Sequence, residues 1–138
     1  MKDKKSLLSL VAVFLFIYAF DFFWHGSLLK PLYDQTPQLW RNDGEIVRYI
    51  SFCLVIHLVY AMIFVKLFRD FILTKNPISL KYVLSAGLLV GELVGILELA
   101  VVIYLPISEF LAIGWFFNRV FQALGVALIM YYLNVKKA

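Results

Sequence analysis

Four apolar runs, each about as long as a membrane is thick, constrain this chain more than any other feature of its sequence. They extend over residues 7–25, 46–68, 82–105 and 110–133. A helix rises about 1.5 Å per residue, so ~20 residues cross a hydrocarbon core of ~30 Å. The pattern predicts an all-α fold, in which residues 1–138 form a single membrane domain of four transmembrane helices.

Composition agrees with this interpretation. Hydrophobic residues make up 63% of the 138 residues and charged residues only 16%, whereas about a quarter of a soluble domain is charged. A soluble bundle of very apolar helices is the alternative, but four such runs would leave almost no polar face for water. The expected partner is therefore the lipid bilayer. The formal net charge of +4 does not indicate nucleic-acid binding, because the basic residues lie at the edges of the runs.

The chain begins like a secretory signal, with Lys2, Lys4 and Lys5 before the first run. However, the run continues into the bulky residues 20–24, where a cleavage site requires small ones. We therefore expect the first run to be a retained span.

Lysine and arginine residues indicate the orientation, because cytoplasmic flanks carry an excess of them. With the N-terminus inside, three of these residues fall on the outer side: Lys30, Arg41 and Arg48. Nine fall on the cytoplasmic side: Lys2, Lys4, Lys5, Lys66, Arg69, Lys75, Lys81, Lys136 and Lys137. The sequence thus predicts that both termini are cytoplasmic.

The longest connection, residues 27–45, is expected to lie along the outer membrane interface. Tyr33 and Trp40 occur in it, and such side chains prefer the headgroup level. The triplet Asn42-Asp43-Gly44 predicts a turn before the second span.

Ionisable residues inside the runs need partners, because one at a helix centre costs about 2.5 to 3.5 kcal/mol. Counting residues from the outer ends places several polar side chains in the outer half or near the midplane. We expect them to form a buried polar cluster, with Arg119 paired to Glu98 because a tight link at residues 106–109 holds the last two spans together. The cluster comprises Asp21, Glu98, Asn118, Arg119 and Gln122.

Two interpretations of this cluster remain open. Ion pairs in membranes can simply specify how helices pack. Alternatively, the cluster forms a proton or ion site, or an anion-binding arginine, that opens to the outer face.

Glycines recur at helical spacing on the last two spans. Gly87, Gly91 and Gly95 form one stripe, while Gly114 and Gly125 share a face with Asn118 and Gln122. Small residues at this spacing let helix backbones approach closely. The two stripes could face each other or the bundle centre, or a stripe could serve as a homodimer face.

Three further ionisable residues are candidates for pH sensitivity or for exposure at the outer face: His25, His57 and Glu92. Asp21 and His25 are four residues apart and share a helix face, but two ligands alone are a weak metal signal. His57 is expected to be a packed, neutral residue on the same side as Cys53 and Tyr60.

Catalytic and cofactor motifs are missing from the sequence. It contains no Walker A loop, G-x-S-x-G, H-E-x-x-H or C-x-x-C pattern. Cys53 is the single cysteine, so no internal disulfide can form. Nothing argues for an enzyme, a bound metal or a cofactor.

The segment Phe20-Asp21-Phe22-Phe23-Trp24-His25-Gly26, followed by Leu28-Leu29 and Tyr33, resembles families of small bacterial four-span membrane proteins with no assigned function. Those families share an early Asp-x-x-Trp or Trp-His/Tyr signature and a glycine-rich third span. The resemblance implies a location in the bacterial inner membrane and draws attention to Asp21, Trp24, His25 and Tyr33.

Three functional hypotheses follow. The first is a multi-pass membrane protein whose polar cluster lines a small-solute or proton pathway. The second is an interaction subunit or chaperone of a larger membrane complex, or a homo-oligomer. The third is an intramembrane enzyme that acts on a lipid-like substrate.

Overall fold

The computed structural model describes residues 2–41, 43–74 and 78–135, and within these ranges the chain is helical and contains no strand. Four long helices dominate it: α1 (Lys2–Phe23), α3 (Asp43–Leu67), α4 (Leu80–Leu99) and α5 (Glu109–Asn134). The expected all-α fold with four long apolar helices is confirmed. Asn42 and the orienting residues Lys75, Lys136 and Lys137 lie outside the described residues.

Three of these helices continue into a turn with a different hydrogen-bond pattern. A π-helical turn, Trp24–Leu28, extends α1, another, Phe68–Ile72, extends α3, and a 3₁₀ turn, Ala100–Ile103, extends α4. Counted with these turns, four stretches of 25, 29, 24 and 26 residues are long and apolar enough to cross a membrane: Lys4–Leu28, Gly44–Ile72, Leu80–Ile103 and Glu109–Asn134.

Serine residues begin the last two long helices. The Ser79 hydroxyl accepts a hydrogen bond from the backbone N–H of Tyr82, and the Ser108 hydroxyl accepts one from that of Leu111. These bonds satisfy N–H groups that have no partner within a helix. Of the turn expected at Asn42-Asp43-Gly44, Asn42 lies outside the described residues, and Asp43 and Gly44 are the first residues of α3 and not turn residues. Glycine is tolerated there, since the first N–H groups of a helix are unpaired in any case.

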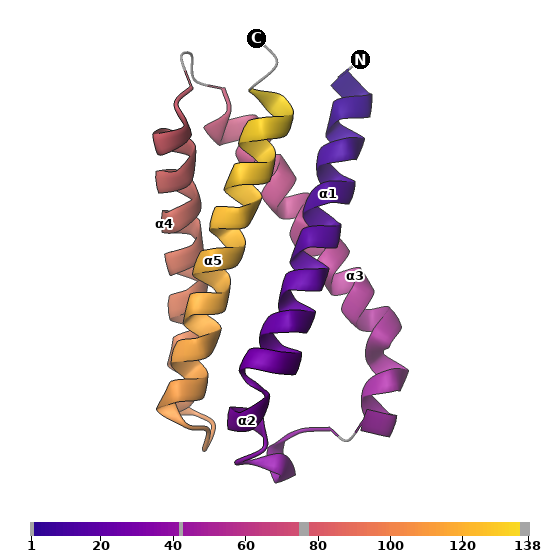
Figure 1. The fold of residues 1–138 in the computed structure, drawn as a ribbon, viewed down its shortest axis with the longest axis vertical. Coiled ribbons are helices and arrows are strands. Elements are labelled where there is room, and N and C mark those ends of the chain that lie inside the picture. Colours follow the sequence, from indigo (N-terminus) through magenta and orange to yellow (C-terminus); the bar gives the residue numbers. More distant parts are fainter. Residues whose placement is uncertain (1, 42, 75–77, 136–138) are drawn as a thin grey trace.

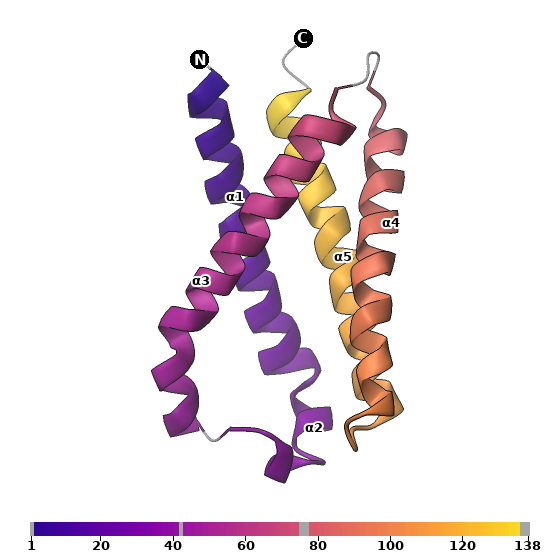
Figure 2. The same cartoon turned by 180° about the vertical axis from the view of Figure 1, so that it is seen from behind.

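The long helices form three packed pairs: α4 with α5, α5 with α1, and α1 with α3 (Figures 1 and 2). Helices α4 and α5 are antiparallel neighbours, while α1 packs against α5 and is crossed by α3. The start of α1 and the end of α5 lie at the same end of the bundle. The first half of α3 leans away from the other helices, and every residue from 44 to 59 except His57 is exposed.

The connection between α1 and α3 folds against the opposite end of the bundle. It contains a short helix α2 (Lys30–Tyr33) and a 3₁₀ turn, Pro37–Leu39. Leu29 is buried there with Leu111 and Ala112 of α5. The segment expected to be an outer loop is therefore a packed cap over the start of α5.

Glycines set the close approach of α4 to α5. A Cβ atom on Gly91 would lie 2.7 Å from the Val120 Cα atom, and one on Gly95 would lie 2.9 Å from the Phe116 carbonyl oxygen. Gly87 similarly faces Ala123 and Ala127 of α5. The stripe on α4 is thus occupied within the chain, which leaves it no room to act as a homodimer face.

The glycines of α5 face a different neighbour. Gly114 lies against Leu29, and Gly125 against Phe16. The two glycine stripes therefore do not face each other, because α5 turns one face to α4 and another to α1.

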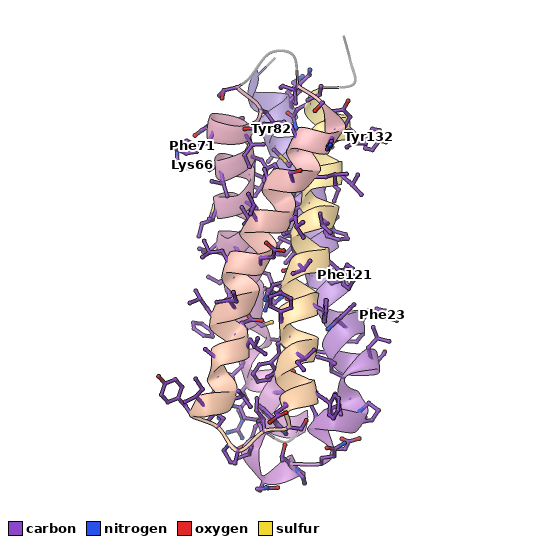
Figure 3. All side chains as sticks on the ribbon, turned by 90° about the vertical axis from the view of Figure 1, so that its left-hand side faces the viewer. Phe23, Lys66, Phe71, Tyr82, Phe121 and Tyr132 are labelled. Atoms are coloured by element: carbon purple, nitrogen blue, oxygen red, sulfur yellow. The ribbon has the colours of Figure 1, made fainter. Side chains whose placement is uncertain are left out.

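The buried interior is layered along the bundle axis. A largely apolar core that includes Val13, Ile17, Phe64, Phe68 and Met130 occupies the half nearer the start of α1. A smaller apolar cluster lies under the α2 cap. Outward-facing positions are also apolar, as Phe23, Phe71 and Phe121 illustrate (Figure 3). The polar side chains described next lie between the two apolar clusters.

Candidate functional site

Arg119 on α5 is the cationic centre of a buried polar cluster. Its Nε donates a hydrogen bond of 2.7 Å to Glu98 Oε1 on α4, as the sequence predicted for this pair. Its Nη1 donates to Gln122 Oε1 at 2.9 Å and lies 3.3 Å from Asp21 Oδ2. One guanidinium thus connects α4, α5 and α1, which suits the forked donor geometry of arginine.

Asp21 on α1 is the hub of the cluster. Its Oδ1 accepts hydrogen bonds from Asn118 Nδ2 at 2.8 Å and Gln122 Nε2 at 3.0 Å. Its Oδ2 lies 3.0 Å from His57 Nε2 on α3. Donors from α3 and α5 therefore converge on one carboxyl group, which compensates for its loss of hydration.

His57 belongs to this cluster, which corrects the expectation of a separate packing residue. Among residues 44–59, it is the one that is not exposed. Its position on the same side of α3 as Cys53 and Tyr60 was visible in the sequence, but its partner on α1 was not. Counting residues from the ends of the spans places His57 and Gln122 at similar depths in the membrane. This similarity was the one sequence feature that could have assigned His57 to the cluster.

The hydrogen bonds of His57 restrict where its protons can be. Nδ1 lies 2.8 Å from the Cys53 carbonyl oxygen, which can only accept, so Nδ1 carries a proton. The contact between Nε2 and Asp21 Oδ2 then contains one further proton, on either the ring or the carboxyl group. The pair is an imidazolium with a carboxylate or a neutral imidazole with a carboxylic acid, and a proton can move between these forms.

A second branch leads from Asp21 towards the cap. Asn118 Nδ2 also lies 2.8 Å from His25 Nε2, and His25 Nδ1 lies 2.6 Å from the Tyr33 hydroxyl. With Asn118 as the donor, a neutral His25 carries its proton on Nδ1 and donates it to Tyr33. His25 Nε2 is 4.0 Å from Asp21 Oδ1. The two histidines thus flank one carboxyl group.

Tyr33 was not predicted as a partner of His25, nor Trp115 as a partner of Tyr33. Trp115 Nε1 donates a hydrogen bond of 2.6 Å to the Tyr33 hydroxyl. Burial raises the pKa of Tyr33 to about 12, although the hydrogen bond from Trp115 opposes this shift. Trp24 joins the turn that follows α1 to α5, since its Nε1 donates a hydrogen bond of 3.0 Å to the Gly114 carbonyl oxygen. Counting residues along the spans could not predict these contacts, because Tyr33 belongs to a connection in which residue number is not related to membrane depth.

One fully buried polar atom of the cluster has no hydrogen-bond partner among the described residues. Asn118 is fully buried, and its Oδ1 accepts no hydrogen bond from them, although both hydrogens of its Nδ2 are engaged. An unpaired buried oxygen costs roughly 1–3 kcal/mol. The orientation of the Asn118 side chain is therefore set by the two hydrogen bonds that its Nδ2 donates, to Asp21 and to His25.

Two cavities flank the cluster. A cavity of about 540 Å³ under the cap is lined by residues that include His25, Tyr33 and Trp40. A cavity of about 240 Å³ between α3 and α4 is lined by residues that include Asp21, His57 and Glu98. The hydrogen-bonded chain from Tyr33 through His25, Asn118 and Asp21 to His57 therefore runs from one cavity to the other.

Glu92 does not join the cluster. It is half-buried on α4, and no hydrogen bond or ion pair connects it to another described side chain. Among the described residues, no group of three or more histidine, cysteine, aspartate or glutamate side chains is placed to hold a metal ion. The cluster instead offers a balanced set of charges with an exchangeable proton.

Comparison with known proteins adds no further constraint: no protein family, curated protein or solved structure matches this chain.

Proposed function

We propose that this chain is a multi-pass integral membrane protein with four spans and both termini in the cytoplasm. The length and hydropathy of the four helices support insertion, as do the exposed apolar side chains on all sides of the bundle. The described residues Lys4, Lys5, Lys66 and Lys81 lie at the end where α1 begins and α5 ends, which supports a cytoplasmic location for that end. The resemblance of the Asp21–Tyr33 segment to bacterial proteins favours the inner membrane.

Labelling of single cysteines tests this orientation. Cys53→Ser removes the native thiol, and Gln38→Cys or Thr74→Cys then adds one exposed thiol at either end of the bundle. In intact cells, a membrane-impermeant maleimide should label the residue-38 thiol and should reach the residue-74 thiol only after lysis. Labelling of both thiols, or the reverse pattern, contradicts the proposed topology.

We further propose that the polar cluster is the proton-binding centre of a proton or small-solute pathway that opens towards the α2 cap. The observation that carries this proposal is the contact between His57 and Asp21. Because Nδ1 is committed to the Cys53 carbonyl oxygen, the Nε2–Oδ2 contact of 3.0 Å holds one mobile proton. Ionisable pairs inside spans are characteristic of proton relays in pumps and transporters.

The position of the cluster supports access from one side. His25 and Tyr33 line the cavity under the cap and lead to Asp21. On the other side, Ile17, Phe64 and Phe68 are buried in the apolar core. In this conformation the route is a half-pathway, and transport across the bilayer requires a second conformation in which that core opens.

Proton uptake into liposomes tests this activity. The purified protein is reconstituted with a pH-sensitive dye inside, and an inward proton gradient is applied. Asp21→Asn should abolish uptake, because an amide does not titrate and so cannot take up a proton from His57 or release one to it. Asp34→Asn is the matched control, since Asp34 pairs with Lys30 on the exposed surface of the cap. A wild-type rate equal to that of empty liposomes, or equal rates for the two variants, counts against a proton pathway.

A further inference from the structure

The cavity of about 240 Å³ between α3 and α4 combines a polar floor with apolar edges. Asp21, His57, Glu98 and Arg119 provide the floor, whereas Ile56 and Val94 stand at the edges. Glu98 is the most accessible of the charged groups, with 29% of its side chain exposed. Glu98 Oε1 is paired with Arg119, but the part of this half-buried carboxylate that faces the bilayer still needs a donor, because hydrocarbon cannot solvate it.

The cavity faces the side of the bundle. Helix α3 packs mainly on α1, and α4 packs on α5, so no extensive contact joins α3 to α4. The residues next to the cavity edges, Val55, Leu93 and Leu97, are exposed apolar side chains. In the membrane orientation proposed above, a molecule dissolved in the bilayer can reach this cavity without crossing water.

Several hydrogen-bonding atoms of the lining residues are unused. Arg119 Nη2, Glu98 Oε2 and the Tyr60 hydroxyl form no hydrogen bond with a described residue. The first and last of these can donate, and a carboxylate oxygen accepts. The Arg119 guanidinium lies 5.6 Å from the centroid of the Tyr60 ring, so the two donors are neighbours. Together they match an acceptor oxygen, of a carbonyl or an ether, next to a hydroxyl group.

The charges of the cluster favour a ligand without net charge. Asp21 and Glu98 are balanced by Arg119 and a protonated His57. An anion would meet the two carboxylates, and a cation would meet the guanidinium. A neutral head group avoids both repulsions and loses less hydration on entry.

The size of the cavity limits what enters it. Cavities that enclose a whole drug-sized molecule measure about 300–1,000 Å³, so one of about 240 Å³ accepts a head group only. The rest of the molecule must then lie along the exposed apolar surfaces of α3 and α4.

We propose that this cavity binds the neutral head group of a lipid-soluble molecule that carries a hydroxyl group next to an acceptor oxygen of a carbonyl or an ether. An isoprenoid quinol with ether and hydroxyl oxygens, or a diacylglycerol, has a head of this chemistry. The inference deepens the proposed function and depends on the membrane orientation given there. It assigns Tyr60, Glu98 and Arg119 to ligand binding and leaves the His57–Asp21 proton within reach of the bound head.

Binding can be measured by native mass spectrometry of the full-length protein released from detergent. Four probes are compared: decylubiquinol, dioctanoylglycerol, the anionic dioctanoyl phosphatidic acid and the cationic dodecylamine. One or both neutral probes should bind at one per chain and more tightly than either charged probe. Binding of only the quinol or only the glycerolipid identifies the source, and binding of both assigns selectivity to the shared oxygens.

Variants test whether the probes occupy this cavity. Tyr60→Phe keeps the ring over Arg119 but removes the hydroxyl, so affinity should fall about 2- to 10-fold, as for one hydrogen bond. Val94→Trp should fill the cavity and abolish binding. Leu8→Trp, at an exposed position of α1 that does not line the cavity, should bind like the wild type.

Tighter binding of a charged probe, absence of binding, or equal binding by Val94→Trp and Leu8→Trp would overturn the inference. The measurement uses no pH gradient. A protein that binds a neutral probe but moves no protons therefore contradicts the proton pathway alone, and the converse result contradicts only the ligand.

Discussion

His57 Nε2 lies 3.0 Å from Asp21 Oδ2, and this contact ties the leaning helix α3 to the polar centre of the bundle. It is flanked on its N-terminal side by the exposed half of α3 and on its C-terminal side by buried Ala61, Phe64 and Phe68. The contact therefore lies where α3 changes from a packed helix to one exposed on all sides. The same pair carries the mobile proton of the proposed pathway.

Loss of this contact should loosen α3. In His57→Ala, the segment from Gly44 to Cys53 should exchange its amide hydrogens faster, because its nearest anchor to α1 is gone. Hydrogen exchange followed by mass spectrometry measures this in nanodiscs. Cys53→Ala is the matched control, because it keeps the carbonyl oxygen that His57 uses. Equal exchange in His57→Ala and the wild type would show that α3 is held by other contacts.

Arg119 should be essential for stability. Arg119→Ala leaves the Glu98 carboxylate buried without its cation, and breaking a buried pair costs about 3–5 kcal/mol. Thermal unfolding in detergent should show a large decrease in Tm. Lys66→Ala removes an exposed ion pair with Asp70 and should cost at most about 1 kcal/mol. If both variants melt alike, the cluster does not organise the bundle.

The packing of α4 on α5 should respond to a single methyl group. In Gly91→Ala the new Cβ meets the Val120 Cα atom at 2.7 Å, so the helices must separate, at a cost of about 1–3 kcal/mol. Gly26→Ala provides the comparison, because a Cβ there has no heavy atom within 4 Å. Tm values of both variants test this, and a neutral Gly91→Ala would contradict the close approach.

The cap should be sensitive to alkaline pH through Tyr33. Burial raises the pKa of Tyr33 to about 12, above its ordinary value of 10.0, so the folded state holds this proton more tightly than the unfolded state. The stabilisation is complete below pH 10 and is lost as the pH rises from about 10 to about 12. The Tm of the wild type should therefore fall faster over this range than that of Tyr33→Phe. Parallel pH profiles of the two proteins would argue against a buried, protonated Tyr33.

Counting residues along the predicted spans identified the Arg119–Glu98 pair of the site but not the contacts of His57 and Tyr33, and the difference has a physical reason. Arg119 and Glu98 lie on helices joined by a tight link, so their levels and proximity followed from the sequence alone. His57 was left out because the long connection between α1 and α3 does not fix how far α3 leans or rotates. Tyr33 belongs to that connection, where no helical period relates residue number to depth.

The glycine stripes show the same division. The four-residue spacing of Gly87, Gly91 and Gly95 predicted a close helix contact, and the structure places α5 there. The sequence could not tell which helix would fill that contact. Periodicity marks a face of a helix but does not identify the neighbour that packs on it.

The sequence by itself determined four apolar helices with an asymmetric distribution of positive charge and a small set of ionisable residues between them. These features depend on length, hydropathy and the cost of a charge in hydrocarbon, which are properties of local segments. Only the tertiary structure decided that Asp21 lies between two histidines and that Arg119 reaches both carboxylates. It also decided that a cavity separates α3 from α4. Such relationships depend on how helices tilt and rotate against each other, and packing between distant segments sets those angles.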